Sequence, residues 1–134
     1  MVVFLVALSE YNLNLREDPT INRMHESLVL LSHLCLSKRL EKIPIILFCT
    51  KEDIFHQKIQ HCHLCWFFLE FSGANEFLEA WDFIIQKFMA VCHKREGMVR
   101  VLVGNLTDCS FMGDVVSFIK RNALQSYVNN NKFT

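Results

Sequence analysis

The sequence of 134 residues contains little glycine, with four residues that stand far apart at positions 73, 97, 104 and 113. Glycines so spaced cannot form the phosphate-cradling loop G-x-x-x-x-G-K-[ST], and none lies three residues after an aspartate, as the switch motif D-x-x-G requires. Loops of these two kinds hold the phosphates and the magnesium ion of nucleotide hydrolases. We therefore expect no magnesium site and no catalytic residue for phosphoryl transfer within these residues.

An excess of charge is also absent, since 14 Lys and Arg residues balance 14 Asp and Glu residues. This balance, together with a hydrophobic share of 51%, excludes the composition of disordered chains and the basic footprint of nucleic-acid-binding proteins. Long apolar runs are missing as well, because none approaches the roughly 18 residues of a membrane-spanning helix. We expect no nucleic-acid partner and no transmembrane segment.

The six cysteines are scattered along the chain, and several lie inside apolar runs. A free thiol in such a run packs as a small hydrophobic side chain, and this usage indicates a reducing compartment. A chain of this length buries about two thirds of its unfolded surface in a single core. We therefore expect one domain over residues 1–134.

Apolar runs typical of buried strands alternate with helical stripes of apolar residues. Strands are expected at Val2–Leu8, Ile43–Cys49 and Met98–Val103, and helices at 21–38, 77–92 and 111–128, with at most a short helix in "EDIFHQKIQ". Such alternation implies parallel strands joined by right-handed crossovers. The fold class predicted is α/β, with three layers and a parallel sheet of three strands alternating with helices.

Polar turns follow the second and third predicted strands. "TKED" leaves the strand that ends at Cys49, and "GNLTD" leaves the strand that ends at Val103. The carboxyl ends of parallel strands meet at one edge of the sheet, where open α/β sheets bind ligands. The sequence therefore predicts a binding site formed by these two turns.

Four segments carry a resemblance to a known family: "VVFLVALSEYN", "EDPTINRMHESLVLL", "IILFCTKEDIF" and "FLEFSGANEF". They resemble the C-terminal half of the Ras-like domain of a heterotrimeric G-protein α subunit, a P-loop GTPase. The combination of "NRMHESL" with the K-x-D turn is the most specific feature. The resemblance implies that residues 1–134 form part of a Ras-like GTPase domain, and that the cofactor is GTP or GDP.

The first guanine-binding turn of that family reads N-K-x-D, and the matching residues are Thr50, Lys51, Glu52 and Asp53. By resemblance, the carboxylate of Asp53 accepts hydrogen bonds from N1 and N2 of guanine, a donor pair that adenine lacks. The methylene stem of Lys51 lies along the face of the base. Thr50 replaces an asparagine, which removes one amide at a cost of about 1–3 kcal/mol where its partner stays buried.

The second base-contacting loop of the family reads T-C-A-T-D and matches the stretch from Gly104 to Asp108. The family's donor to O6 of guanine is a backbone N–H, which falls at Leu106. A side-chain change does not remove that donor, although leucine is larger than the alanine it replaces. The nucleotide-binding residues implied by the resemblance are thus Thr50, Lys51, Asp53 and Leu106.

Two functions are compatible with these features. In the first, the chain represents a G-protein α subunit, a GTP-binding and GTP-hydrolysing transducer in G-protein-coupled receptor signalling. Its implied partners are the βγ dimer, a seven-helix receptor and an effector, at the cytoplasmic inner face of the plasma membrane. In the second, the chain is an enzymatically inert interaction module or truncated product, with an effector-like surface on the helix at 21–38 and the following "CLSKRLEK". No lipid anchor is expected, because Val2 follows Met1 where myristoylation needs glycine.

Two other groups of side chains are weaker candidates. His56, His61, Cys62, His63 and Cys65 include a C-x-x-C pair, but a second ligand pair at finger spacing is absent, so we expect a variable loop and not a zinc site. Glu26 matches a helix acid that engages the activated switch in the family, while an ordinary solvated helix charge explains it equally well.

Overall fold

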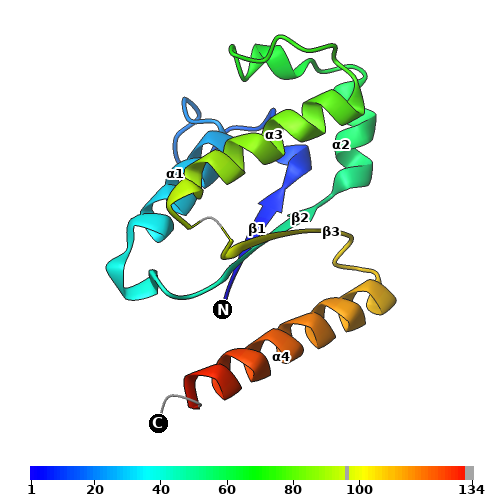
Figure 1. The fold of residues 1–134 in the computed structure, drawn as a ribbon. Coiled ribbons are helices and arrows are strands. Elements are labelled where there is room, and N and C mark those ends of the chain that lie inside the picture. Colours follow the sequence, from blue (N-terminus) through cyan, green and yellow to red (C-terminus); the bar gives the residue numbers. More distant parts are fainter. Residues whose placement is uncertain (96, 132–134) are drawn as a thin grey trace.

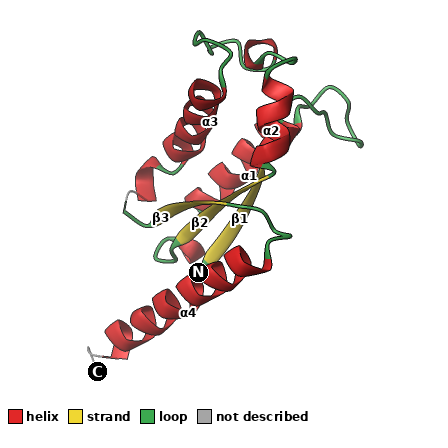
Figure 2. Cartoon of the chain, turned by 90° about the vertical axis from the view of Figure 1, so that its right-hand side faces the viewer, coloured by secondary structure: helices red, strands yellow, loops and turns green. Residues whose placement is uncertain are grey.

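The computed structural model describes residues 1–95 and 97–131 and forms an α/β fold of three layers, as predicted (Figures 1 and 2). The parallel sheet has the order β1-β2-β3. Its strands are β1 (Val2–Ala7), β2 (Ile45–Thr50) and β3 (Val99–Val103). The helices are α1 (Arg23–Leu36), α2 (Glu52–Ile59), α3 (Phe77–Val91) and α4 (Cys109–Asn131), with short 3₁₀ turns η1 (Leu8–Glu10), η2 (Lys38–Leu40), η3 (Leu64–Trp66) and η4 (His93–Arg95).

Local hydrogen bonds move some element ends from their predicted positions. The second strand begins at Ile45, because the N–H of Ile43 donates to the carbonyl of Leu40 at 2.9 Å in a turn that also leaves Pro44 outside the strand. The last helix begins before Phe111, because the carboxylate of Asp108 accepts from the N–H of Ser110 at 3.0 Å. This bond caps the first turn of α4.

The central strand β2 is buried at all six of its positions. Ile45 pairs with Val2 of β1 on one side and with Val99 of β3 on the other. A strand that is hydrogen-bonded along both edges and covered on both faces accepts only apolar or fully paired side chains, which explains the continuous run "IILFC".

One face of the sheet carries the main core, beneath α1 and α3 (Figure 1). Its strand residues alternate along each strand, as the two-residue period of a pleated strand requires. Helices and loops supply mainly aliphatic and phenylalanine side chains to it. The fully buried members with the largest side chains include Tyr11, Leu31, Leu47, Phe55, Phe68 and Phe88.

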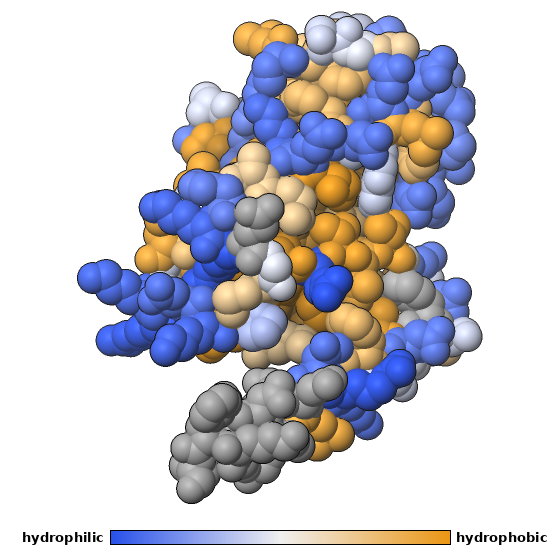
Figure 3. Space-filling view, in the orientation of Figure 1, coloured by the Kyte–Doolittle hydropathy of each residue, from blue (hydrophilic) through white to orange (hydrophobic). Residues whose placement is uncertain are grey.

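The opposite face is covered only in part, by α4 (Figure 2). Val115 of α4 packs on Ile46 and Phe48 of β2. Val3 and Leu5 of β1 pair in register with these two residues, but they are 43% and 55% exposed. Figure 3 shows apolar surface over the part of the molecule where Figure 1 draws the sheet.

The start of α1 is fixed by Asn22. Its side-chain oxygen accepts from the N–H groups of Met24 and His25 at 2.9 and 3.2 Å, and its amide donates to the carbonyl of Tyr11 at 2.7 Å. The helix cap and the preceding loop are therefore held by one side chain. Arg23, the first helical residue, adds an ion pair with Glu10 at 3.0 Å.

Asn22→Ala removes the cap of α1 and the bond to Tyr11 together. We expect a loss of about 1–2 kcal/mol in the free energy of unfolding, since an N-cap and a part-buried hydrogen bond are both lost. Urea denaturation under conditions in which the chain is monomeric measures the change. Gln86→Ala, an exposed substitution in the middle of α3, is the control and should change stability by less than about 0.5 kcal/mol. Equal effects of the two substitutions would contradict the role of Asn22.

The strand β1 is an edge of the sheet in the described part of the chain, and it combines unpaired backbone groups with exposed Val3 and Leu5. Such an edge is a template for pairing with another chain. We expect the unmodified chain to self-associate, and Val3→Lys or Leu5→Lys to raise the monomeric fraction in size-exclusion chromatography with light scattering.

Leu78→Lys is the matched control, because Leu78 is 70% exposed on α3, away from any sheet edge. It should raise the monomeric fraction less than either substitution in β1. A monodisperse, cooperatively melting monomer of the unmodified chain would overturn this prediction.

Candidate functional site

Two loops come together where β2 and β3 end. The N–H of Gly104 donates to the carbonyl of Cys49 at 3.0 Å, which continues the ladder of parallel strands by one residue past Val103. The loop that follows β3 is thereby held beside the turn that follows β2. The prediction that these loops share one edge of the sheet is confirmed by the parallel order of the strands.

Between the two loops lies a hollow of about 190 Å³, lined by Lys51, Glu52, Asp53, Gly104 and Asn105. Pockets that enclose a whole drug-sized ligand start near 300 Å³, so a hollow of this size suits a single flat ring system better than a complete nucleotide. The side chains of Lys51 and Asp53 are exposed at its rim. Both charges are therefore accessible to a ligand.

The four predicted site residues are placed differently by the structure. Lys51 and Asp53 line the hollow. Thr50 is the last residue of β2, is only 5% exposed and lies outside the lining. Leu106 is 49% exposed and also lies outside the lining, although it follows Asn105 directly.

Lys51 makes the turn from β2 into α2. Its backbone has φ 58° and ψ 37°, and it is the sole residue other than glycine with a positive φ in the described chain. A left-handed backbone at a residue with a side chain costs about 1–3 kcal/mol, and such residues concentrate at functional sites. The helix α2 begins at the next residue, so that Asp53 stands in its first turn.

The electrostatics around Asp53 favour a ligand that donates hydrogen bonds. No side chain caps the N-terminus of α2, and the carboxylate of Asp53 accepts no hydrogen bond from another described residue. The N-terminal end of a helix carries partial positive charge, which stabilises an ionised carboxylate there. A carboxylate that accepts nothing from the described residues can accept two donors from a ligand at the rim of the hollow.

Cys49 lies directly beneath this turn and is 1% exposed. Burial, together with the charge of Glu52, raises the pKa of its thiol to about 12. The thiol is therefore neutral near pH 7 and packs as an apolar side chain.

Asn105 shapes the second loop, although the sequence comparison with the family assigned it no role. Its side-chain oxygen accepts from the N–H of Thr107 at 3.0 Å and from the hydroxyl of Thr107 at 2.8 Å. This Asx turn holds Asn105 against the hollow. The signal in the sequence was the "GN" pair that leaves the strand, a typical turn dipeptide.

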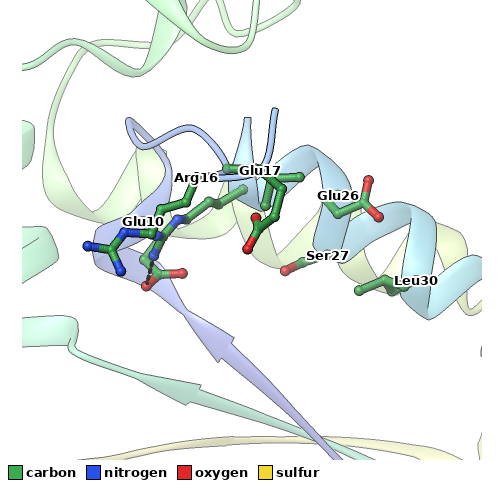
Figure 4. Close-up of a pocket in the computed structure, with 8 residues that line it drawn as sticks. Glu10, Arg16, Glu17, Glu26, Ser27 and Leu30 are labelled. Carbon is green, nitrogen blue, oxygen red and sulfur yellow. Dashed lines mark hydrogen bonds and ion pairs between the residues drawn. The ribbon is translucent and has the colours of Figure 1, made fainter. Parts of the chain in front are cut away.

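A second hollow, of about 330 Å³, lies between the loop after β1 and the outer face of α1 (Figure 4). Glu10, Glu17 and Glu26 contribute three carboxylates to it, and Figure 4 draws the ion pair that connects Glu10 to Arg23. Glu26 itself has no hydrogen-bond partner for its carboxylate in the described part of the chain. Arg16 and Arg23 line this hollow as well, so three acids face two arginines there, whereas two acids face one lysine in the hollow at the strand ends.

The Cys- and His-rich segment does not assemble a metal site from described residues, where no three His, Cys, Asp or Glu side chains converge. The imidazole of His56 lies 4.6 Å from the ring of Phe77, and that of His63 lies 5.1 Å from Trp66. Cys62 accepts a hydrogen bond from Asn12 at 3.6 Å. These side chains take part in packing contacts of the loop.

The chain forms a parallel α/β fold with a hollow at the carboxyl edge of its sheet, the edge where open α/β sheets bind ligands. A comparison with models of protein families matches residues 1–123 to the family described as G-protein alpha subunit. The chain belongs to this family. Among the described residues, none of the helices combines the length and the apolar character needed to span a bilayer.

Members of this family generally bind GTP or GDP with magnesium. The hollow beside Asp53 fits the base of such a nucleotide, because it offers a free carboxylate, the stem of a lysine and backbone groups of Gly104 and Asn105. The glycine positions of the sequence supply no cradle for the phosphates.

Proposed function

We propose that the chain acts in a G-protein α subunit as the part of a Ras-like GTPase domain, over residues 1–134, that recognises the guanine base of GTP or GDP. One observation carries the proposal: the left-handed turn at Lys51 places the unpaired carboxylate of Asp53 in a hollow shared with Gly104 and Asn105. A carboxylate in this position selects a ring edge with two adjacent donors, which guanine presents and adenine does not.

Each proposed contact has a distinct physical role. Asp53 accepts from N1 and N2 of guanine in charge-assisted hydrogen bonds. The stem of Lys51 covers one face of the ring, and its exposed ammonium group stays in water. The backbone N–H of Leu106 donates to O6, while Thr50, buried at the end of β2, supports the turn from below.

Membership of the family extends the proposal to partners and location. We infer that the chain serves a transducer that binds the βγ dimer, a seven-helix receptor and an effector, at the cytoplasmic inner face of the plasma membrane. The carboxylate of Glu26, which has no partner among the described residues, supports a contact between α1 and a basic protein segment. This surface is separate from the hollow that recognises the base.

Asp53→Asn tests the base site directly. The substitution places an amide donor where guanine also donates and where xanthine carries a carbonyl, so preference should shift from GDP toward XDP. Competition against a fluorescent guanine nucleotide, with GDP, XDP and ADP as competitors, measures the shift. We expect the ratio of GDP to XDP affinity to fall by about tenfold or more, as one misplaced hydrogen bond to a charged group costs about 1.5–3 kcal/mol.

Asp82→Asn is the control for this experiment, because Asp82 is an exposed carboxylate on α3 outside the hollow. It should leave the preference among GDP, XDP and ADP unchanged. Unaltered guanine selectivity in Asp53→Asn would show that the turn after β2 does not contact the base.

A second prediction concerns hydrolysis by the 134-residue chain. We expect no release of phosphate from GTP above the uncatalysed rate, with or without magnesium, because phosphoryl transfer depends on positioned phosphates and metal. Measurement of phosphate release from purified chain, beside an Asp53→Ala control, checks this. Magnesium-dependent release that disappears in the control would refute the prediction.

A second candidate function, an enzymatically inert interaction module, is supported by the surface of α1. Val29, Leu30 and Leu36 are 47%, 52% and 59% exposed, and Leu30 also lines the hollow around Glu26. Exposed apolar side chains beside the carboxylate of Glu26 suit an interface with a partner of complementary, basic charge. The nucleotide competition experiment distinguishes the two functions, because an inert module shows no nucleotide binding that depends on Asp53.

A further inference from the structure

Two cysteines far apart in the sequence meet where α1 and α3 end. Cys35 lies in the last turn of α1, and Cys92 is the residue that ends α3. Their sulfur atoms are 3.6 Å apart, although the residues are separated by 57 positions. No other pair of cysteine sulfurs is in hydrogen-bond contact within the described part of the chain.

The two thiols differ in their access to solvent. Cys35 is half-buried and lines a pocket of about 250 Å³, together with Lys38, Lys94 and Arg95. Cys92 is 2% exposed and lies behind Cys35 in the core. A small oxidant in the pocket therefore reaches the sulfur of Cys35 first.

The two thiols have different surroundings. Burial, together with the contact with Cys35, raises the pKa of the Cys92 thiol to about 12, so this thiol is protonated at rest. The guanidinium of Arg95 acts in the opposite sense and favours the thiolate of Cys92. Three cationic side chains and one acid, Glu41, line the pocket in front of Cys35.

Arg95 is held rigidly in this arrangement. It is 3% exposed, and its guanidinium donates to four backbone carbonyls, those of Leu34, Cys35, Ser37 and Ile43, at 3.2–3.4 Å. The bonds fix the end of α1 against η4. The two sulfurs are therefore kept close by the fold itself and do not depend on a transient approach.

We propose that Cys35 and Cys92 form a redox site in which hydrogen peroxide reversibly converts two thiols into a disulfide that joins α1 to α3. The Cys35 thiolate attacks one oxygen of the peroxide, the O–O bond breaks, and the departing hydroxide takes up a proton to leave as water. Cys35 is then a sulfenic acid. The sulfur of Cys92 attacks the sulfur of Cys35, the S–O bond breaks, and the oxygen leaves with the Cys92 proton as a second water.

The geometry requires only a small movement. A disulfide bond is about 2.05 Å long, so the sulfurs must approach by about 1.5 Å, which side-chain rotation in the end turns of two helices can supply. The bond would close a loop of more than 50 residues in the unfolded chain, a length at which cross-links stabilise substantially. A thiol reductant such as dithiothreitol or thioredoxin would reopen it by exchange.

The test uses the full folded chain treated with hydrogen peroxide, alkylated, and digested with trypsin without reduction. We expect the peptide 24–38 joined to the peptide 88–94, with a mass lower by two hydrogens than their sum, and we expect dithiothreitol to abolish it. The melting temperature of oxidised chain should rise by about 5–10 °C. In Cys92→Ser the rise should disappear, and Cys35 should accumulate sulfenic acid that dimedone labels.

Cys109→Ser is the matched control, because Cys109 is exposed and contacts none of the other thiols among the described residues. It should leave both the cross-linked peptide and the melting shift intact. The proposal would be overturned by oxidation that joins Cys62 to Cys65 or links separate chains while Cys35 and Cys92 stay reduced. Dimedone labelling of Cys35 in the unsubstituted chain without subsequent cross-linking would also overturn it. The peptide mapping uses the unsubstituted chain, so its result does not depend on the folding of any variant.

Discussion

Burial of the central strand β2 on both faces and along both edges is the constraint on which the rest of the structure depends. All six of its residues are buried, so each backbone group must find its partner on β1 or β3. The crossovers that make those partners parallel place α1 and α3 on one face and leave α4 for the other (Figure 2). Because β2 and β3 are parallel, the loops that follow them, which form the candidate base site, meet at one edge of the sheet.

The burial of β2 also explains why the sequence changes abruptly from apolar to charged residues after Thr50. A strand that is apolar on both sides cannot continue into solvent, and the chain leaves it through a single left-handed residue, Lys51. The strain of that backbone is offset by the ladder on one side and by α2 on the other. Three charged side chains thus follow a fully buried run without any intermediate, and the carboxylate of Asp53 accepts no hydrogen bond from the residues that the structure describes. The proposed base site rests on this arrangement.

The fold could be predicted from the sequence because its strands and long helices have unmistakable periods. Uninterrupted apolar runs rich in β-branched residues marked β1 and β2, and apolar residues at spacings of three and four marked α1 and α3. Side-chain contacts that cross the chain could not be predicted in this way. The burial of Arg95 depends on four backbone carbonyls from a different segment of the chain. From its sequence neighbours alone, in "HKRE", Arg95 would be expected to lie exposed to solvent.

The candidate site shows the same limit on a smaller scale. Spacing and resemblance located Lys51 and Asp53, whereas the exclusion of the Thr50 side chain from the hollow follows from the length of β2. The contribution of Asn105 depends on the Asx turn with Thr107, which only coordinates reveal. Similarly, the 57 residues between Cys35 and Cys92 hide their contact from sequence reasoning.

The two proposed sites lie at opposite ends of the same layer of helices. The residues around Asp53 gather at the carboxyl end of the strands, while Cys35, Cys92 and Arg95 gather where α1 and α3 end, near the start of β2 and β3 (Figure 1). The helix α1 is anchored at its first turn by Asn22 and at its last turn by the carbonyls that Arg95 binds. A bond between Cys35 and Cys92 would tighten one anchor without touching the other.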